Sequence, residues 1–416
     1  MPISHKQKQI LAFQYTKYDA LICDGAIRSG KTVFMTIAFI DDIMRRYDKT
    51  KAAICGKTVS SAIENVVKPY MAIAYPNKKY SMRFNRADKL LTISDGKHTN
   101  VFEIFGGRDE SSYALIQGRT LSGVLIDEVA LQPRSFVEQA VGRCSVEGSK
   151  FWFNCNPESP QHWFYKEWIC DLMKHNAYHL HFQLEDNPSL SEKMIARYKA
   201  MYSGVFYDRY ILGRWTLAEG LIYEKYEQAF EEPHEFKVSD ICVSLDYGTQ
   251  NAFAAIMWAK DSSGIWHGVK EYYYSGREKG IQKTDEEYLQ DLVEFVYGDT
   301  DEEEMPRGVQ VIVDPSAASF IASLRKCGLF KVRKAKNNVL DGIRHTASAL
   351  NNGYIKLSKN CNRLHDEMST YSWDTKSNED RPVKVDDHAC DAMRYFVETK
   401  KVYNEDKQPY QSIFGG

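Results

Sequence analysis

Several features are missing from this chain of 416 residues, and each absence excludes a class of protein. No apolar run approaches the roughly 18 residues of a membrane-spanning helix. The opening residues, MPISHK, lack the apolar core of a secretory signal peptide. The nine cysteines form no CxxC pair, and their odd number argues against a disulfide framework or a zinc cluster. We therefore expect a cytosolic protein without membrane contact, whose cysteines are reduced and mostly buried.

The chain also lacks a strong net charge, which is −2, but its charges are unevenly distributed. Residues 1–218 carry 29 Lys and Arg against 22 Asp and Glu, whereas the remaining residues carry 25 against 34. A nucleic acid would meet the second half only through a local basic surface or a bound metal ion, because the summed charge repels phosphate. The length exceeds that of one ordinary core and predicts two domains.

The first informative motif is GAIRSGKT at residues 25–32, which fits the phosphate-loop pattern GxxxxGK[ST]. It follows the apolar run ALIC at residues 20–23, which predicts a strand, and it precedes a helical pattern. Gly25 and Gly30 allow close approach of the backbone to phosphate groups. Lys31 is expected to reach the β- and γ-phosphates of ATP, and Thr32 to hold Mg²⁺. Alternatively, the motif is a glycine turn before an ordinary amphipathic helix.

A second motif favours the nucleotide site over that alternative. The apolar run at residues 124–126 ends in Asp127 and Glu128, as expected of a buried parallel strand that carries acids to the carboxyl edge of a sheet. Asp127 would bind Mg²⁺ through water. Glu128 would act as the general base that polarises the attacking water.

Three further side chains are candidates for the nucleotide site. Gln7, in preference to Gln9, could read adenine, because an amide offers both a donor and an acceptor. A solvated N-terminal helix is an equally good interpretation of this segment. Asn156 follows the apolar strand pattern at residues 151–153 and could sense the γ-phosphate, although Asn156-Pro157 could also be only a turn.

Three arginines are candidates for stabilising the transition state. Arg28 lies inside the phosphate loop and could reach phosphate from the same subunit. Arg119 and Arg108 are alternative arginine fingers that could be supplied to a neighbouring subunit. Each arginine could also be an ordinary surface residue.

The order of predicted elements indicates an α/β architecture. Strands and helices alternate over most of residues 20–212, which predicts a mostly parallel sheet. Residues 80–106 interrupt this pattern with an antiparallel meander that includes the hairpin signal Asp95-Gly96. A polar and aromatic connection at residues 218–237 marks the domain boundary. Three adjacent antiparallel strands are predicted over 241–274, followed by a helix at 284–297.

The second half places four metal-binding side chains at the ends of predicted elements. Asp246 and Asp314 each follow an apolar strand, and His388 and Asp391 share one face of a late helix that begins near Asp386 or Asp387. Such a set can build a two-metal nuclease site. Asp246 would bridge both ions, Asp314 and Asp391 would each hold one, and His388 would be a ligand or a proton carrier. The alternative is that these acids form turns, cap the helix or lie at the surface.

Together these motifs, in this order, resemble the large terminase subunit of tailed bacteriophages over nearly the whole chain. The matching segments are residues 25–32, 127–128, 154–157, 186–188, 207–215, 220–223, 246, 314 and 387–392. The resemblance implies an α/β fold with a P-loop ATPase domain at 1–217, a linker at 218–237, an RNase H-like nuclease domain at 238–400 and a C-terminal tail at 401–416. It also implies that Arg28 is the phosphate-loop arginine. The third metal-binding acid falls among Asp386, Asp387 and Asp391, of which Asp391 is favoured.

The same resemblance implies ATP-driven translocation of double-stranded DNA into a viral procapsid and metal-dependent cutting of concatemeric DNA. The implied cofactors are ATP with Mg²⁺ at the first site and two Mg²⁺ or Mn²⁺ ions at the second. The implied partners are double-stranded DNA, the portal protein, a small terminase subunit and further copies of the chain in a ring. The protein would work in the cytoplasm of the infected host, transiently at the procapsid portal, and would be absent from the mature virion.

Two other functions remain as alternatives. A helicase-nuclease of DNA repair or recombination would share both sites but usually carries additional helicase motifs and a second motor lobe. The second alternative is a structural capsid or portal-associated protein with a degenerate nucleotide site. The intact residues Lys31, Thr32, Asp127 and Glu128 argue against this alternative.

Overall fold

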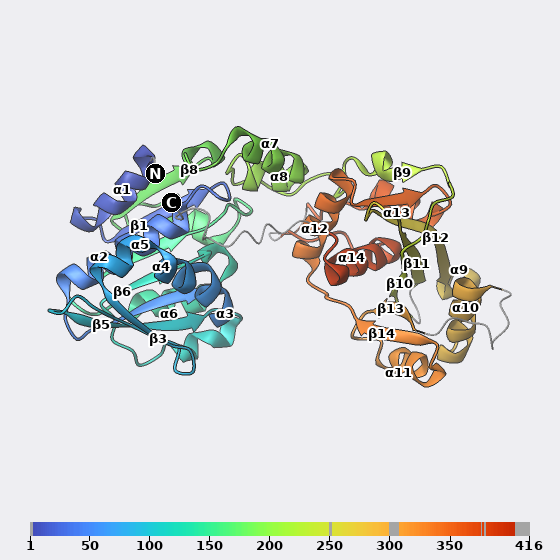
Figure 1. Ribbon diagram of the computed structural model, residues 1–416, viewed down its shortest axis with the longest axis horizontal. Coiled ribbons are helices and arrows are strands. Elements are labelled where there is room, and N and C mark those ends of the chain that lie inside the picture. The colour runs from blue at the N-terminus through green and yellow to red at the C-terminus, as the bar shows by residue number, and fades with distance from the viewer. Residues whose placement is uncertain (1–2, 249–251, 299–307, 376, 378–379, 404–416) are drawn as a thin grey trace. The chain divides into compact units, whose positions relative to one another are not determined.

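The computed structural model describes residues 3–248, 252–298, 308–375, 377 and 380–403. These residues form two compact units (Figure 1). The first contains the described residues up to Lys199 together with Val205–Leu217, and the second contains Ala200–Gly204 and the described residues from Ala218 to Tyr403. Most of the predicted C-terminal tail, from residue 404 onward, lies outside the described residues.

The first unit is built on an eight-stranded sheet with the order β3-β4-β5-β2-β6-β7-β1-β8. From β5 to β8 all neighbours in this order are parallel, and β3 and β4 extend the sheet through antiparallel pairs. The predicted parallel sheet and antiparallel meander are thus confirmed. The strands are β1 (Ala20–Gly25), β2 (Lys51–Gly56), β3 (Ser81–Asn85), β4 (Leu90–Ser94), β5 (Thr99–Gly106), β6 (Gly123–Ile126), β7 (Lys150–Asn154) and β8 (Ala177–Phe182).

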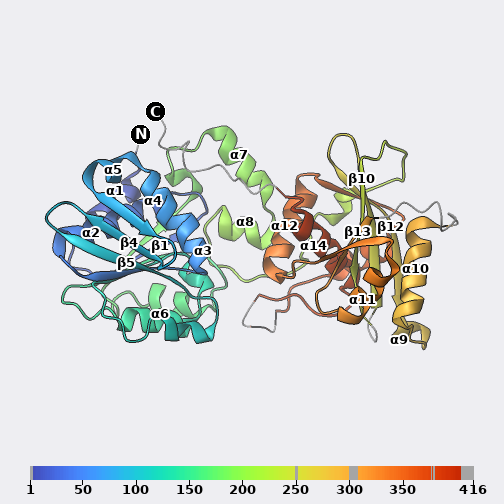
Figure 2. The same cartoon turned by 60° about the horizontal axis from the view of Figure 1, so that its bottom comes forward.

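Helices cover both faces of this sheet. The helices of the segment that ends at Tyr210 are α1 (His5–Ala12), α2 (Lys31–Arg46), α3 (Val59–Ala62), α4 (Lys68–Ala72), α5 (Ala74–Lys79), α6 (Arg134–Gly142), α7 (Glu192–Met201) and α8 (Gly204–Tyr210). Helices α1, α2 and α4 pack on one face, and α6 packs on the other with the π-helical turn Tyr165–Ile169. Figure 2 shows α6 on the opposite side of the sheet from α1 and α4. Coverage of both faces explains why β1 and β6 are buried along their whole length.

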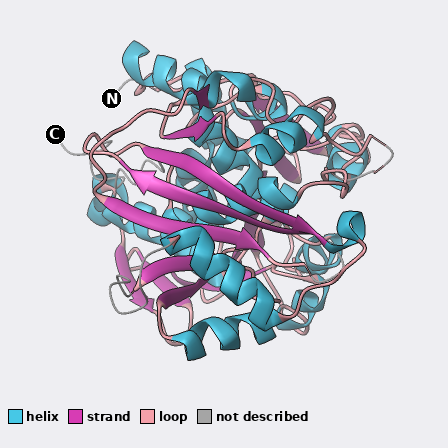
Figure 3. Cartoon of the chain, turned by 90° about the vertical axis from the view of Figure 1, so that its right-hand side faces the viewer, coloured by secondary structure: helices cyan, strands magenta, loops and turns pink. Residues whose placement is uncertain are grey.

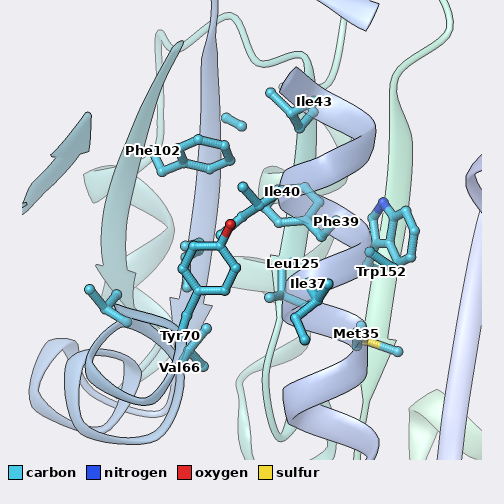
Figure 4. Close-up of a cluster of buried hydrophobic side chains, with 14 of the residues drawn as sticks. Met35, Ile37, Phe39, Ile40, Ile43, Val66, Tyr70, Phe102, Leu125 and Trp152 are labelled. Carbon is cyan, nitrogen blue, oxygen red and sulfur yellow. The ribbon is translucent and has the colours of Figure 1, made fainter. Parts of the chain in front are cut away.

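The larger core of this unit lies between α2 and the sheet. Phe39 of α2 meets Phe102 of β5 and Trp152 of β7 edge to face, with ring centroids 5.8 and 6.1 Å apart (Figure 4). Ile40 and Ile43 of the same helix are fully buried in this cluster. Because α2 begins at the phosphate loop, this packing also anchors the loop against the sheet.

The second unit is built on a seven-stranded mixed sheet with the order β14-β13-β10-β11-β12-β15-β9. Strands β10, β11 and β12 are consecutive antiparallel neighbours, as predicted, and β13 pairs parallel to β10. Counted from β10, the five strands β12-β11-β10-β13-β14 have the order 3-2-1-4-5 with only the second strand reversed, the arrangement expected of an RNase H-like fold. The strands are β9 (Phe230–Glu231), β10 (Asp240–Asp246), β11 (Ala252–Lys260), β12 (Trp266–Ser275), β13 (Val309–Val313), β14 (Phe330–Lys334) and β15 (Ile355–Ser358).

Helices also lie on both faces of the second sheet (Figure 3). One face packs against α10 and α11. The other packs against α14, whose Phe396 stacks on Trp258 of β11 at 4.0 Å. The helices of this unit are α9 (Gly276–Lys279), α10 (Asp285–Tyr297), α11 (Ala318–Cys327), α12 (Val339–Asn351), α13 (Asn362–Thr370) and α14 (His388–Lys400).

The predicted connection at 218–237 contains a short 3₁₀ turn, Tyr226–Ala229, and β9. A two-residue strand carries no periodic signal, so the sequence did not predict it. All nine cysteines are free thiols and six of them are buried, as expected. In the part of the chain that the structure describes, no helix combines the length and apolar character needed to cross a bilayer.

Candidate functional sites

The phosphate loop runs from the end of β1 into α2. Gly25 has φ of 121°, and a Cβ there would lie 2.0 Å from the carbonyl oxygen of Phe182, so no other residue fits. Gly30 has φ of 88° and lies against the side chain of Gln7. Two hydrogen bonds tie the loop to later segments: Ala26 N donates to Phe182 O at 2.8 Å and Ile27 N to Tyr210 O at 2.9 Å. These contacts hold the loop in a fixed curve at the start of α2.

Lys31 lies inside this curve and is only 6% exposed. Its ammonium donates to the carbonyl oxygens of Gly25 at 3.0 Å and Ala26 at 2.6 Å. Burial lowers the pKa of Lys31 to about 8, although nearby thiols and the carboxylates of Asp24 and Asp127 oppose the change. The side chain is therefore a buried cation held at the centre of the loop, as a phosphate-binding lysine requires.

Thr32, Asp127 and Asn154 form a small polar cluster beside the loop. The Thr32 hydroxyl donates to Asp127 Oδ1 at 3.1 Å, and Asn154 Nδ2 donates to the same oxygen at 2.8 Å. Burial raises the pKa of Asp127, while hydrogen bonds from Asn154 and Thr32 oppose the rise. A hydroxyl and a buried carboxylate that face each other are hard oxygen ligands, so the two predicted Mg²⁺ residues fit this ion.

Glu128 follows directly in a strained backbone conformation. Its φ of 55° lies in the left-handed region, which a glutamate rarely adopts. Its amide donates to Asn154 Oδ1 at 3.1 Å, so one asparagine holds both acids at the end of β6. Gln132 Nε2 adds a bond of 2.7 Å to the Asp127 carbonyl. The half-buried Glu128 side chain is thus presented on a turn whose geometry is set from the neighbouring strand.

Arg28 and Asn156 lie at the same loop. Arg28 also has a left-handed φ, 54°, and an exposed side chain, and its carbonyl accepts a bond of 2.6 Å from Asn187 Nδ2. Asn156 Oδ1 accepts a weak bond of 3.4 Å from Lys31 Nζ. The structure therefore brings Lys31 and Asn156 into contact, and the Arg28 carbonyl links the loop to the Asp-Asn-Pro segment at residues 186–188.

Gln7 is 1% exposed and both ends of its amide are engaged. Its Nε2 donates to Ser29 O at 3.3 Å, and its Oε1 accepts from Ser4 N at 3.0 Å in a capping box at the start of α1. Gln9 instead donates to the Tyr178 hydroxyl at 2.9 Å. Gln7 is the glutamine beside the phosphate loop, and its predicted contact with adenine stays a prediction.

The two alternative arginine fingers lie elsewhere on the first unit. Arg119 is exposed and forms an ion pair with Glu103 at 3.3 Å. Arg108 is exposed in the loop that follows β5. Neither has a contact with the phosphate loop among the interactions seen in the described residues, so a role in a neighbouring subunit stays a prediction.

The second cluster forms at the carboxyl edge of the second sheet. Because Leu245 and Val313 are partners in the parallel pair of β10 and β13, the next residues, Asp246 and Asp314, end adjacent strands. Asp314 accepts bonds of 2.8 Å from both Asn337 Nδ2 and the Tyr395 hydroxyl. Burial opposes ionisation of Asp314, but its hydrogen bonds, including those from Ser316 and Tyr395, outweigh burial and lower its pKa.

Helix α14 brings His388 to the same edge. His388 Nδ1–H donates to Asp246 Oδ2 at 2.8 Å. Burial lowers the pKa of His388, but the bond and charge of Asp246, together with the charges of Glu367 and Asp387, outweigh burial and leave the pKa raised. Burial raises the pKa of Asp246, the bond from His388 opposes the rise, and the charges of Asp391 and Asp387 add to it. Several acids thus lie close together at one strand end. Divalent cations stabilise such an arrangement, so it fits the two predicted metal ions.

The acids of α14 already have cationic partners. Asp391 Oδ1 accepts bonds of 3.0 and 2.9 Å from Arg394 Nε and Nη2, and its Oδ2 lies 3.3 Å from Lys384 Nζ. The same ammonium donates to Asp387 Oδ2 at 2.8 Å. Asp386 is exposed and has a φ of 49°. Asp387 and Asp391 therefore both lie in the cluster and share one lysine, and the choice of Asp391 as metal ligand stays a prediction.

Sequence reasoning missed two residues that organise these sites. Asn154 ends β7 and forms hydrogen bonds with Asp127 and Glu128. Its position at the end of a predicted strand could have indicated this role. Glu367 of α13 is buried, and its Oε2 accepts bonds from the amides of Ala389 at 2.7 Å and Cys390 at 2.9 Å at the start of α14. Of the two predicted cap positions, Asp386 and Asp387, the N-cap residue is Asp387, but its side chain makes no capping bond. Because Glu367 lies on another helix, no local pattern indicated it.

Comparison with known proteins gives consistent matches. Residues 22–229 match the family model for the N-terminal part of the terminase large subunit, T4-like virus type. The chain is similar to the large terminase of a thermophilic bacteriophage, with 45% identity and a TM-score of 0.90, covering 97% of this chain and 100% of that one. The same phage protein in complex with ATP-gamma-S matches with 45% identity and a TM-score of 0.84, covering 95% and 98%. The large terminase subunit of Escherichia phage T5 is 22% identical over 347 residues, which are 77% of this chain and 74% of that protein.

Proposed function

The chain belongs to the large terminase subunits of tailed bacteriophages, and from this premise we propose that it hydrolyses ATP to move double-stranded DNA into a procapsid and cuts that DNA at a second site. The observation that carries the proposal is the presence of two polar clusters at the carboxyl edges of two separate sheets. Residues 1–217 would hold the motor, 218–237 the connection and 238–400 the nuclease.

ATP would bind at the phosphate loop. The large terminase of the thermophilic bacteriophage has been crystallised with ADP and with ATP-gamma-S, and it is 45% identical to this chain. The backbone amides of the loop and the first turn of α2 would surround the phosphates. The Lys31 ammonium would exchange the carbonyl oxygens of Gly25 and Ala26 for phosphate oxygens. Phosphate charge would also raise its pKa again and keep it protonated.

Hydrolysis would depend on the two acids at the end of β6. Thr32 and Asp127 would hold Mg²⁺, and this ion would supply positive charge that offsets the charge developing during hydrolysis. Glu128 would accept the proton of the attacking water, because its turn presents the carboxylate beside Asp127. Arg28 would stabilise charge in the transition state from within the same subunit. Asn156, which contacts Lys31, would sense whether the γ-phosphate is present.

DNA cleavage would take place at the acids of the second unit. Asp246, Asp314 and Asp391 would hold two Mg²⁺ or Mn²⁺ ions, which when bound activate water and stabilise the leaving oxygen. His388 holds a proton at Nδ1 towards Asp246 and is placed to move protons or to act as a ligand. Because the second half of the chain has a net negative charge, it would contact DNA through bound metal ions and local basic residues. Cutting should therefore be sensitive to salt and weakly sequence-specific.

The family also supports the proposed partners and location. We propose that the chain assembles as a ring on the portal of a procapsid, that a small terminase subunit brings it to viral DNA, and that it leaves before the virion matures. The location would be the cytoplasm of the infected bacterium. A helicase-nuclease is less well supported, because the similarity to a terminase extends over 97% of the chain.

A DNase-protection assay tests the motor function. Procapsids with their portal, this protein, linear DNA and ATP should yield DNA that resists added DNase, whereas ATP-gamma-S should yield none. ATP hydrolysis without protected DNA would contradict translocation. In parallel, the protein should nick plasmid with Mn²⁺ but not with EDTA, and nicking that persists in EDTA would contradict a metal-dependent nuclease.

A further inference from the structure

A cluster of metal-binding side chains lies on the second unit away from the nuclease acids. It contains Glu231 of β9, His234 of the following loop and His267 of β12. One ligand atom from each residue lies within 4.8 Å of the other two. Two of the three residues are held by the sheet, because Glu231 pairs with Ser358 of β15 and His267 pairs with Ala259 of β11.

The register of the sheet separates this cluster from the nuclease site. On β11, Asp246 is opposite Ala254 and His267 is opposite Ala259. Five residues of strand correspond to about 17 Å along β11. The cluster therefore lies towards the opposite end of the strands from the carboxyl edge, and it is a separate feature from the nuclease acids.

His267 is oriented as a metal-binding histidine would be. It is 7% exposed, and Phe236 packs on its ring at 4.4 Å between centroids. Its Nε2 faces Asp261 Oδ2 at 3.2 Å, while its Nδ1 faces Glu231 Oε1 at 2.8 Å. A carboxylate that accepts the proton of one ring nitrogen leaves the lone pair of the other for a metal ion. Asp261 would thus hold the Nε2–H tautomer and direct Nδ1 at the cluster.

We propose that Glu231, His234 and His267 bind a divalent transition-metal ion of the zinc class. Tetrahedral zinc with ligand bonds of about 2.0–2.1 Å places its ligand atoms about 3.4 Å apart. Glu231 Oε1 lies 2.8 Å from His267 Nδ1 and 3.9 Å from His234 Nδ1, distances that bracket this value. His234 is half exposed and would exchange its bond to the Glu232 carbonyl for the ion. Water would complete the fourth position.

The ligand set determines which ions fit. Two imidazoles with one carboxylate favour zinc, cobalt or nickel over Mg²⁺, which prefers oxygen ligands. A bound ion would join three segments of the second unit, namely β9, the loop that follows it and β12. It would therefore fasten the end of the predicted connection at 218–237 to the sheet, as a structural ion does.

The test uses the full-length protein with Asp246→Asn, so that zinc binding by the nuclease acids is reduced in every sample. After dialysis against Zn²⁺, the metal content per chain is measured, and the melting temperature is recorded with and without the ion. His234→Ala and Glu231→Gln should each remove one equivalent of zinc, or weaken its binding at least about tenfold, and should abolish the zinc-dependent rise in Tm. Asp261→Asn should weaken binding without removing a ligand. His98→Ala is the matched control, because His98 is a surface histidine paired with Asp95.

The outcomes are distinguishable. Loss of one zinc equivalent in His234→Ala and Glu231→Gln, but not in His98→Ala, supports the site. Equal zinc content in His234→Ala and its parent overturns it, as does a parent that retains no zinc. Co²⁺ substitution provides a second readout, because a tetrahedral site gives visible absorption that His234→Ala should remove. Circular dichroism identifies any variant that fails to fold, and the remaining ligand variant then decides.

Discussion

At the scale of single residues, Asn154 links the parts of the nucleotide site. Its Nδ2 bonds Asp127, which faces Thr32, and its Oδ1 accepts the amide of Glu128. Glu128 can hold its left-handed backbone because this bond and the bond from Gln132 to the Asp127 carbonyl fix the turn. One amide on β7 therefore positions both acids of β6.

Lys31→Ala and Glu128→Gln should each stop ATP hydrolysis, but for different reasons. Lys31→Ala removes the cation that binds the phosphates, so nucleotide binding should be lost as well. Glu128→Gln removes only the base, so turnover should fall by about 10²- to 10⁴-fold while binding persists. Phosphate release and fluorescent-nucleotide binding measure the two effects. The exposed Lys97→Ala is the control, and near-normal turnover in Glu128→Gln would remove Glu128 from the role of base.

Asn154→Ala should lower the affinity of the nucleotide site for Mg²⁺ more than it lowers the affinity for nucleotide. Without the amide, Asp127 and Glu128 lose their shared support, and loss of such a supporting residue typically costs about 10- to 100-fold in metal affinity. A Mg²⁺ titration of the ATPase rate should show this shift, whereas nucleotide binding in EDTA should change little. An unaltered Mg²⁺ dependence would mean that Thr32 and the loop alone position Asp127.

At the scale of elements, the first two turns of α14 carry side chains of the proposed nuclease site. His388 bonds Asp246, Asp391 lies one turn further along, and Tyr395 bonds Asp314. The amides at the start of α14 are satisfied by Glu367 of α13 and not by the side chain of Asp387. The placement of the helix face that carries His388 and Asp391 therefore depends on contact between α13 and α14.

Glu367→Gln should change how stability depends on pH. Burial raises the pKa of Glu367 to about 7, while the amides of Cys390 and Ala389 oppose the rise. Between pH of about 4.5 and 7 the native carboxyl holds a proton that the unfolded chain has released, so this group lowers stability as pH rises through that window. Its full cost above pH 7 is on the order of 3 kcal/mol. Glutamine keeps an oxygen acceptor but does not titrate, so the variant should gain in Tm relative to the parent as pH rises.

Melting curves in EDTA from pH 4 to 8 measure this difference, with the exposed Glu64→Gln as the control. The gap in Tm between Glu367→Gln and the parent should widen up to about pH 7 and then stay constant. A gap that is independent of pH would contradict the raised pKa, because it would mean that Glu367 binds protons equally in the folded and the unfolded chain.

At the scale of the whole molecule, the two proposed chemistries belong to two separate sheets. The residues proposed to bind nucleotide all belong to the first unit, and the acids proposed to cut DNA all belong to the second. Both sites lie at the carboxyl ends of parallel strands, where strand-end side chains converge. Because each site is completed within its own unit, each activity should be removable alone.

Asp246→Asn should abolish plasmid nicking and leave ATP hydrolysis unchanged. The substitution removes a metal-binding charge at β10 and touches no residue of the first unit. Nicking and phosphate release should be measured side by side in the full-length protein. Asp240→Asn is the matched control, because Asp240 begins the same strand, is exposed and pairs only weakly with Lys400 at 3.3 Å. Undiminished nicking in Asp246→Asn, or loss of ATPase in a folded sample, would contradict the two-site arrangement.

Much of the architecture was readable from the sequence because its signals are local. Apolar runs that end in an acid predicted β6, β10 and β13, and the glycines of the phosphate-loop motif indicated a loop whose backbone can approach phosphate closely. Antiparallel segments around Asp95-Gly96 were predicted from turn chemistry. These patterns depend on side-chain period and backbone sterics, which neighbouring residues determine.

Tertiary structure alone decided which of these residues meet. The bond between His388 and Asp246 joins positions 142 residues apart, and the support of Asp127 by Asn154 depends on the order of strands β6 and β7. The placement of Gln7, rather than Gln9, beside the phosphate loop depends on how α1 packs on α2. The cluster of Glu231, His234 and His267 arises because β9 joins the sheet edge beside β15. Register and packing are set by the burial of whole faces, so no single segment of the sequence encodes them.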